Sequence, residues 1–297
     1  MSRLLVVLHI FYHDQVDYFI DKLANISDCE WDLTVTWSEF SQESYDKLKA
    51  FKPDLTVQLV SNAGYDVWPF IQVIRNTDFS RYDYVLKLHT KRFMTKSMRI
   101  EGLKMEKWFW RDALLNPILK SKERFSRCLS IMDSNPKVGY ICSYELHMNL
   151  EDMLPEDEML LRQEADRISM ENFDKGRFCA GTMFLARIQA LQKLKEIEFT
   201  DEMWNFKQKS GASGTLAHVY ERMLCLLMRD AGYRAKAIPH SKRKSSKVFY
   251  RRNLYPVIKN VFTLSRCSKT DQKYMIILGR RFNLSALDKR RSSVRNK

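Results

Sequence analysis

Basic side chains gather at one end of an apolar segment, residues 82–92 of the chain. Lys87 and His89 alternate with leucines there, so both side chains share one face of the strand that this pattern predicts. A buried charge needs a partner, and for Lys87 that partner must be a carboxylate or a phosphate. Together with Lys91 and Arg92, these side chains would form a cationic site suited to a pyrophosphate. The alternative is an edge strand with solvated lysines.

A carboxylate and an imidazole share a helical segment that follows a glycine-containing loop, residues 214–222. His218 and Arg222 are four residues apart and lie on one helix face, and Glu221 neighbours His218 at a spacing of three. Glu221 could therefore take a proton from a substrate hydroxyl, with His218 beside it. The alternative is a structural ion pair between Glu221 and a buried basic residue.

Two further segments combine a turn with side chains that could bind a nucleotide. Tyr12 ends the apolar run 3–12 and could stack on a base, or it could cap the hydrophobic core. Asn62 and Gly64 precede a predicted helix, and glycine permits a tight turn with a positive φ. The amino end of a helix favours anions, and Asp66 is placed to cap this helix. The alternative for this segment is a plain loop with a capping residue.

Small residues stand together at Ala180, Gly181 and Thr182. They would let a ligand approach the backbone closely, because they place few side-chain atoms in its way. The alternative is tight packing of this segment against a helix.

The elements that must position these residues follow from the apolar pattern of the chain. Strands are expected at residues 3–12, 31–37, 54–60, 82–88, 138–143, 178–186 and 233–238. Helices are expected at residues 14–26, 41–51, 67–76, 105–115, 122–134 and 216–231. This alternation predicts an α/β fold with a mostly parallel central sheet and helices on both faces. Ligands bind at the carboxyl ends of the strands in such sheets, where the residues named above lie.

The charge of the chain is concentrated near its carboxyl terminus. The 297 residues carry a formal net charge of +14, and residues 241–297 alone contain 17 basic and two acidic residues, a net charge of +15. Residues 1–240 hold 33 basic and 34 acidic residues, a net charge of −1. This distribution argues against a nucleic-acid-binding surface spread over the whole fold. The 12% content of aromatic residues excludes a disordered chain.

Residues 241–297 interleave basic with large apolar residues, a pattern typical of amphipathic helices on an anionic membrane surface. Helices packed onto the rest of the chain, or a nucleic-acid-binding tail, are the alternatives. No run reaches the ~20 apolar residues that span a bilayer. We therefore expect a cytoplasmic protein, peripheral on the inner face of the cytoplasmic membrane. The six cysteines form no CxxC pair and no cluster with histidine, which predicts neither a zinc site nor a disulfide framework.

The order of these motifs resembles the rhamnan synthesis protein F family, bacterial proteins of rhamnose-containing polysaccharide assembly. The matching segments extend over roughly residues 3–240 and are residues 62–70, 82–91, 180–187, 218–222 and 232–233. The strings KLHTK and AGTMF are the most specific of them. Ala63 and Tyr65 stand where the family has two arginines, a departure that bears on how a donor would bind.

The resemblance implies a GT-A-like glycosyltransferase domain in residues 1–240, with a nucleotide-binding half at about 1–92 and an acceptor half at 93–240. Residues 241–297 would form a basic helical tail that contacts an anionic membrane surface. The implied reaction moves rhamnose or a similar deoxyhexose from a dTDP-rhamnose-like donor. The implied acceptor is a growing, lipid-linked cell-surface polysaccharide.

Each motif takes a role within that resemblance. Donor binding is assigned to Tyr12, Asn62, Gly64, Asp66, Lys87, His89 and Lys91. The sugar or acceptor pocket is assigned to Ala180, Gly181 and Thr182. Glu221, with His218 beside it, stands where inverting enzymes of this fold keep their catalytic base.

The resemblance also bears on the metal requirement. Common GT-A enzymes carry an Asp-x-Asp motif at the end of the strand that corresponds to residues 82–88, and it holds a divalent metal on the donor pyrophosphate. His89, Thr90 and Lys91 occupy that place here. Carboxylates bind Mg²⁺ or Mn²⁺, whereas a histidine and a lysine would neutralise the phosphates directly. We therefore expect no divalent metal and no other cofactor.

Two other classes of protein are alternatives. A GT-A-like fold that lacks a metal site could be a non-catalytic partner in a polysaccharide assembly complex. A basic RNA-binding protein would use residues 241–297, and its affinity for RNA would fall steeply with salt. No nucleic-acid partner is expected, because residues 1–240 show no RNA- or DNA-binding motif.

Overall fold

The computed structural model of the protein describes residues 1–100, 103–150, 155–171, 173, 176–204, 214–266, 273–278 and 280–283. The chain divides into two compact units. The first, here called the body, comprises Met1–Ile100 and Lys104–His240, and the second comprises Glu101–Leu103 and Ser241–Lys297.

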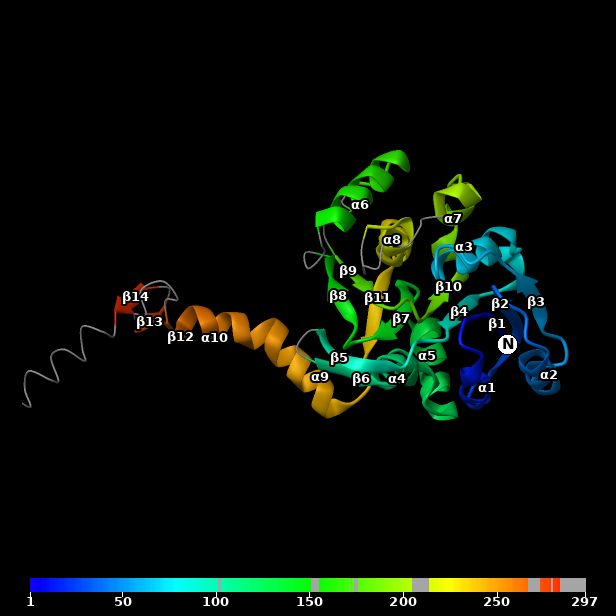
Figure 1. The fold of residues 1–297 in the computed structure, drawn as a ribbon, viewed down its shortest axis with the longest axis horizontal. Coiled ribbons are helices and arrows are strands. Elements are labelled where there is room, and N and C mark those ends of the chain that lie inside the picture. The colour runs from blue at the N-terminus through cyan, green and yellow to red at the C-terminus, as the bar shows by residue number, and fades with distance from the viewer. Residues whose placement is uncertain are drawn as a thin grey trace, which may run out of the picture. The chain divides into compact units, whose positions relative to one another are not determined.

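A seven-stranded sheet forms the centre of the body (Figure 1). Its strand order is β11-β7-β10-β4-β1-β2-β3, and of these strands only β10 runs antiparallel to its neighbours. The strands are β1 (Ser2–Ile10), β2 (Cys29–Trp37), β3 (Thr56–Leu59), β4 (Tyr84–His89), β7 (Val138–Ser143), β10 (Phe184–Arg187) and β11 (Arg234–Ile238). The prediction of a mostly parallel α/β sheet is confirmed.

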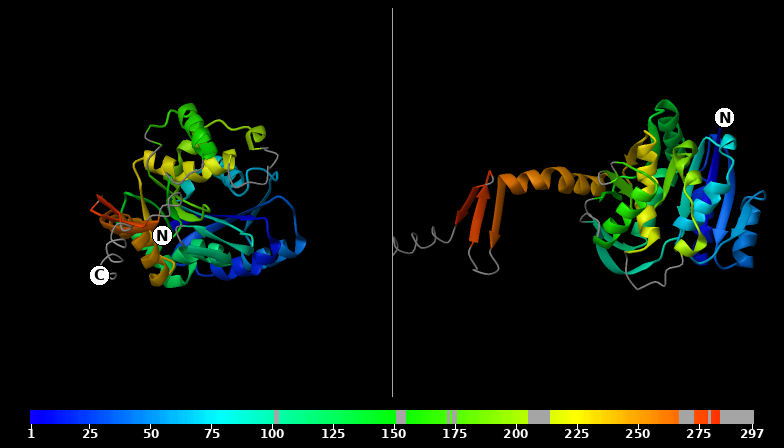
Figure 2. Two further views of the ribbon diagram at one scale, coloured as in Figure 1. Left: turned by 60° about the vertical axis from the view of Figure 1, so that its left-hand side comes forward. Right: turned by 90° about the horizontal axis from the view of Figure 1, so that it is seen from above.

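Helices cover both faces of this sheet, as predicted (Figures 1 and 2). One face carries α1 (Val16–Leu23), α2 (Gln42–Phe51), α4 (Phe109–Leu119) and α5 (Lys122–Ser134). The other carries α3 (Val67–Asn76), α6 (Pro155–Arg167), α7 (Lys193–Glu196) and α8 (Leu216–Asp230). Serine or threonine side chains cap three of these helices by accepting a backbone N–H bond, and they are Ser41 on α2, Ser121 on α5 and Thr215 on α8.

The middle of the sheet is buried on both faces. Every residue of β4 is buried, and so is β1 from Leu4 to Ile10. Continuous apolar runs are what a parallel strand needs when helices cover both of its faces. Lys87 and the paired residues His9 and His89 interrupt this apolar interior, which makes them the feature of the sheet that most needs a chemical explanation.

Two predicted elements are wrong in their bounds. The helix expected at 105–115 begins only at Phe109, and before it β5 (Met94–Ile100) and β6 (Leu103–Lys107) form a two-stranded sheet. Leu103 and Met105 are buried while Lys104 between them is exposed, an alternation that suits a strand.

The strand expected at 178–186 is also wrong, because it is two strands joined by a turn. The first half is β9 (Arg177–Cys179), which pairs with β8 (His147–Asn149), and the second half is β10. Positive φ angles at Gly181 and Thr182 break the extended chain between them.

The second unit was expected to be helical, and this is correct for only part of it. The helical part runs through α9 (Lys242–Phe249), a π-helical turn (Tyr250–Leu254) and α10 (Tyr255–Val261). After it, β12 (Phe262–Arg266), β13 (Lys273–Ile277) and β14 (Arg280–Asn283) form an antiparallel sheet. β-Branched residues favour strands over helices, and Thr263 is paired with Ile276 in this sheet. Residues 284–297 of the expected tail lie outside the described residues.

Within the described part of the chain, none of the helices has both the length and the apolar character that crossing a bilayer requires.

Candidate functional site

Lys87 lies at the centre of the sheet with 1% of its side chain exposed. Its ammonium group donates hydrogen bonds to Oδ2 of Asp66 and to Oγ1 of Thr182, the latter at 2.8 Å. Thr182 Oγ1 in turn donates to the same carboxylate oxygen at 2.5 Å. The carboxylate partner that Lys87 was predicted to need is therefore Asp66. We call these three residues the lysine triangle.

Asp66 does not cap α3, so that prediction is wrong. It occupies the residue before the helix, but its side chain makes no capping hydrogen bond. Burial alone would raise the pKa of the Asp66 carboxyl, but the positive charges of Lys87 and Lys91 hold that pKa well below its usual value. The long-range ion pair has replaced the local cap, because an uncompensated buried ammonium group costs more free energy than a missing cap.

His89 is buried beside the lysine triangle and is neutral. Burial lowers its pKa to about 3, against the attraction of Asp66, whose Oδ1 is 3.6 Å from His89 Nδ1. His89 Nε2 lies 2.7 Å from the carbonyl oxygen of Gly181, and Nδ1 lies 3.0 Å from that of Thr90. A neutral imidazole has one N–H, and the shorter contact places it on Nε2, donating to Gly181. His89 therefore fixes a backbone turn.

Gly181 is held from both sides of its peptide backbone. Its carbonyl accepts from His89, and its N–H donates to Oε1 of Glu221 at 2.5 Å. Its φ is +92°, and a Cβ there would lie 2.7 Å from Cδ1 of Leu114 and 3.1 Å from Nε1 of Trp110. Gly181 thus packs tightly against α4, which is the alternative that its small size left open. Ala180 and Thr182 beside it are buried as well.

Glu221 and His218 project from the first turns of α8. Glu221 keeps 21% of its side chain exposed, and its Oε2 is 4.0 Å from Arg222. Arg222 itself pairs at 2.9 Å with the buried Asp157 of α6, so Glu221 is not its main counterion. The carboxylate of Glu221 therefore has one oxygen held by a backbone N–H and one near the surface.

His218 is oriented by the residue that caps its helix. Its Nδ1 lies 2.8 Å from Oγ1 of Thr215, and its ring lies 5.6 Å from the ring of Tyr65. Burial lowers the pKa of His218, while the carboxylates of Glu221 and Asp157 oppose that shift. Among the described residues no hydrogen-bond partner is found for Nε2. In the tautomer whose Nδ1–H donates to Thr215, Nε2 carries the lone pair that accepts a proton.

Lys91 and Tyr12 are brought together by buried polar groups at the carboxyl ends of β1 and β4. The hydroxyl oxygen of Thr90 accepts from the N–H groups of Phe11 and Tyr12 at 2.9 and 3.0 Å. The buried side chain of Gln15 donates to the carbonyl of Lys91 at 2.8 Å. The ammonium group of Lys91 lies 4.3 Å from the centroid of the Trp110 ring. Lys91 and Tyr12 remain half-buried, which leaves part of each side chain open to a ligand.

Asn62 and Gly64 are not joined to this network by any contact that the described residues show. Asn62 is exposed. Gly64 has a φ of +66°, and a Cβ there would lie 2.5 Å from Cβ of Trp68, so packing alone explains the glycine.

Sequence reasoning missed Gln15, Trp110 and Thr90 as supports of the site. Gln15 is 2% exposed at the start of α1, and a polar residue on the apolar face of a predicted helix was the available signal. Trp110 and Thr90 offered no signal, because their roles depend on which elements meet in space.

No three His, Cys, Asp or Glu side chains of the described residues are grouped so that they could hold a metal ion. The Asp66 carboxylate, whose Oδ1 lies 3.6 Å from His89 Nδ1, is already bound by Lys87 and Thr182.

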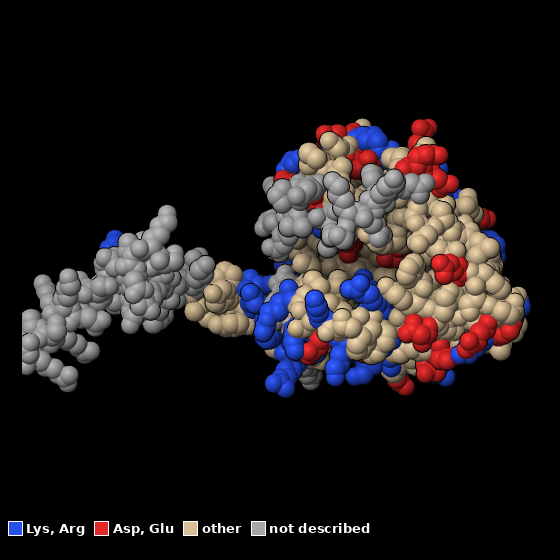
Figure 3. All heavy atoms as spheres, viewed as in Figure 1, with Lys and Arg blue, Asp and Glu red and all other residues tan. Residues whose placement is uncertain are grey.

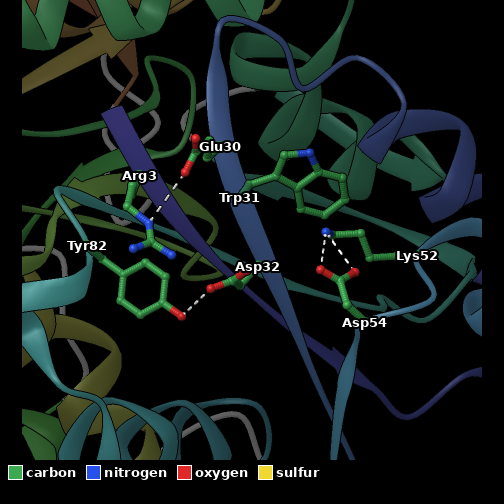
Figure 4. A pocket seen from close by; sticks show the side chains of 7 residues that line it. All are labelled: Arg3, Glu30, Trp31, Asp32, Lys52, Asp54 and Tyr82. Atoms are coloured by element: carbon green, nitrogen blue, oxygen red, sulfur yellow. Dashed lines mark hydrogen bonds and ion pairs between the residues drawn. The ribbon is translucent and has the colours of Figure 1, made fainter. Parts of the chain in front are cut away.

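A separate hollow of about 310 Å³ lies at the opposite, amino-terminal edge of the sheet (Figure 4). It is lined by Arg3, Glu30, Trp31, Asp32, Lys52, Asp54 and Tyr82. Its polar groups satisfy one another: Lys52 pairs with Asp54 at 2.8 Å, and Tyr82 donates to Asp32 at 2.6 Å. It lies at the other end of the strands from the hydrogen bonds of Lys87, His89 and Gly181.

The lysine triangle gives a first prediction about stability. Asp66→Asn removes the counterion of Lys87, and removing one partner of a buried pair costs about 3–5 kcal/mol. The free energy of unfolding in urea at pH 7 should fall by about that amount. Because the folded pKa of Asp66 is lowered, the wild-type pair stabilises the fold above the ordinary pKa of about 3.9, and this stabilisation is lost as the pH falls further.

The matched control removes both charges. Asp66→Asn combined with Lys87→Met should recover most of the lost stability, because no buried charge is then left unpaired. A double variant as unstable as the single one would show that the ion pair is not the cause.

The two buried histidines of the sheet predict a second, milder acid sensitivity. Burial lowers the pKa of His9 to about 4 and that of His89 to about 3, against about 6.5 in an unfolded chain. The unfolded chain therefore binds more protons below pH 6.5, and stability falls as the pH falls toward the folded pKa values. Each histidine should contribute a loss of about 2 kcal/mol between pH 7 and pH 5. Urea unfolding at both pH values measures this loss, and His89→Asn should reduce it. An unchanged free energy of unfolding would contradict the burial of neutral imidazoles.

The amino-acid sequence matches the protein family described as rhamnan synthesis protein F over residues 1–233. Two similar proteins, each called uncharacterized protein WxcX, come from two strains of Xanthomonas campestris pv. campestris and are 25% and 24% identical over 238 residues. The similarity covers 78% of this chain but 32% of each relative, so the chain spans about a third of the length of these relatives. With the family match extending over most of its length, the chain belongs to the rhamnan synthesis protein F family.

Proposed function

We propose that this protein, whose family is linked to polysaccharide synthesis, is a glycosyltransferase with a GT-A-like body. It would move rhamnose or a similar deoxyhexose from a dTDP-rhamnose-like donor to a growing, lipid-linked cell-surface polysaccharide. The observation that carries this proposal is the turn at Gly181, fixed between buried His89 and partly exposed Glu221 at the carboxyl edge of the sheet. Such a turn holds a carboxylate in a set position where ligands of parallel sheets bind.

Of the three basic residues assigned to donor binding, only one would offer a positive charge to the donor. Lys87 is neutralised by Asp66 and His89 is neutral, so among these three Lys91 is the side chain that would bind the pyrophosphate. Lys87, His89 and Asp66 would act as positioning residues that fix the strand end and the turn. Tyr12, held beside Lys91 through Thr90, would contact the nucleotide base.

Asn62 and Gly64 would line the donor side of the site, with Tyr65 beside them in place of an arginine of the family motif. The turn that contains Ala180, Gly181 and Thr182 would form one wall of the sugar pocket.

The acceptor hydroxyl would be deprotonated from α8. In a single inverting displacement, the acceptor oxygen attacks the anomeric carbon and its proton passes to Glu221 or, through His218 Nε2, to the adjacent imidazole. The bond from the anomeric carbon to the phosphate oxygen breaks, and the nucleoside diphosphate leaves with its electron pair. Lys91 would stabilise the negative charge that develops on the leaving phosphate.

A non-catalytic role in a polysaccharide assembly complex is the second candidate. It is favoured by the lysine triangle, in which the ion pair with Asp66 makes the positive charge of Lys87 unavailable to a pyrophosphate. The RNA-binding alternative rests on the charge of residues 241–297, whereas residues 1–240 have a net charge of −1. The location proposed for either candidate is the inner face of the cytoplasmic membrane.

Donor binding and transfer give a third prediction. Saturation-transfer NMR against a panel of nucleotide sugars should show contact with at least one deoxyhexose donor. Glu221→Gln keeps the size of the side chain but not its basicity, so it should retain that contact while transfer falls by at least about 100-fold. His218→Gln, tested in parallel, distinguishes which group receives the proton. A chain that binds no donor would favour the non-catalytic role.

Metal independence gives a fourth prediction. Transfer should persist in EDTA, because Lys91 rather than a divalent metal would neutralise the leaving phosphate. Lys91→Gln should lower transfer sharply with and without added Mg²⁺ or Mn²⁺. Complete loss of transfer in EDTA, restored by either metal, would contradict the proposed metal independence.

A further inference from the structure

The segment that follows the candidate site is strongly basic. Residues 92–107 contain five basic and two acidic residues, a net charge of +3, whereas residues 1–240 as a whole have a net charge of −1. The rest of that region is therefore acidic on balance. The basic residues are Arg92, Lys96, Arg99, Lys104 and Lys107. We call the described part of this segment, residues 92–100 and 103–107, the β5–β6 segment.

The β5–β6 segment presents this charge to solvent. From Thr95 to Arg99, every residue of β5 is exposed, so neither face of that strand is covered. In β6, Leu103 and Met105 are buried while Lys104 and Lys107 are exposed. Figure 3 shows basic side chains gathered over the part of the body that holds β5 and β6.

Large apolar side chains are exposed among these cations. Phe93 is 40% exposed and Met98 is 43% exposed, although apolar residues of this size gain free energy from burial. Phe93 is anchored by the ring of Trp108, at a centroid distance of 5.0 Å. Basic side chains that flank exposed apolar side chains are typical of segments that bind at the surface of a lipid bilayer. The basic side chains contact anionic headgroups, and the apolar side chains enter the boundary between headgroups and acyl chains.

We propose that the β5–β6 segment is a docking surface for an anionic phospholipid bilayer. The occupant follows from charge complementarity together with exposed Phe93 and Met98, which a purely electrostatic partner would leave in water. The segment starts directly after Lys91, so docking places the carboxyl edge of the sheet beside the lipid surface. The basic residues of this surface and the exposed Phe93 and Met98 belong to the body, whereas residues 241–297 belong to the second unit. It does not depend on the proposed reaction, since a non-catalytic protein would use it equally.

The proposal is tested on the full chain with vesicles of phosphatidylcholine alone and with added phosphatidylglycerol. Binding is measured by flotation at the salt concentration where half of the wild-type protein is bound. Replacing Lys96, Arg99 and Lys104 with glutamine should lower the partition coefficient at least tenfold, since each cation near an anionic surface contributes roughly fivefold. The matched control replaces Lys49, Lys120 and Lys137, exposed cations near the amino edge of the sheet, and should change binding less than threefold.

A local probe separates this surface from any contribution of residues 241–297. A bimane fluorophore on Met98→Cys, in a chain that also carries Cys29→Ser and Cys267→Ser, should shift to the blue on phosphatidylglycerol vesicles. The same label on Ala50→Cys, an exposed position of α2, should not shift. Equal binding by both triple variants, or no shift at Met98→Cys, would overturn the proposal. So would a triple variant that keeps vesicle binding but loses binding to a mixed-sequence RNA, since the partner would then be nucleic acid.

Discussion

The centre of this structure is organised around one buried ammonium group, which must be neutralised by residues from other segments. Lys87 sits in a strand covered on both faces, where a lone charge could not persist. Asp66 compensates it from the residue before α3, and Thr182 completes the hydrogen bonds from the turn before β10. Three segments far apart in sequence must therefore meet at one point. The charge that folding must neutralise is also what brings the candidate site residues into place.

The polar groups of the lysine triangle bind one another. The groups that can bind a ligand or transfer a proton are therefore those around the triangle. His89, on the same strand as Lys87, donates to Gly181, and Gly181 donates to Glu221, so a strand, a turn and a helix share one hydrogen-bonded path. The groups that keep contact with solvent lie at the ends of this path: Glu221 and His218 on one side, and Lys91 and Tyr12 on the other. Rigid, buried polar groups thus support a few accessible ones, an arrangement expected of a binding or catalytic site.

Much of this fold could be predicted from the sequence, because covered parallel strands and amphipathic helices have distinct apolar patterns. The helices at Val67–Asn76 and Lys122–Ser134 and the strand at Val138–Ser143 have the predicted bounds. The need of Lys87 for an acidic partner was also readable, but its identity depended on strand order. The cap expected of Asp66 failed because a long-range ion pair outweighs a bond worth ~1 kcal/mol. The neutral state of His89 could not be predicted, because it depends on burial by other elements. The strands β5 and β12–β14 could not be predicted either, because they are short and their apolar residues follow no clear period.

The direction of β10 has one more consequence. At the carboxyl edge of the sheet, each parallel strand is followed by its loop, as β4 is followed by Lys91. β10 runs in the opposite direction, so the loop that it places at this edge comes before the strand. That loop contains Gly181 and Thr182. An insertion that reshapes this edge must therefore come after a parallel strand in the sequence, but before β10.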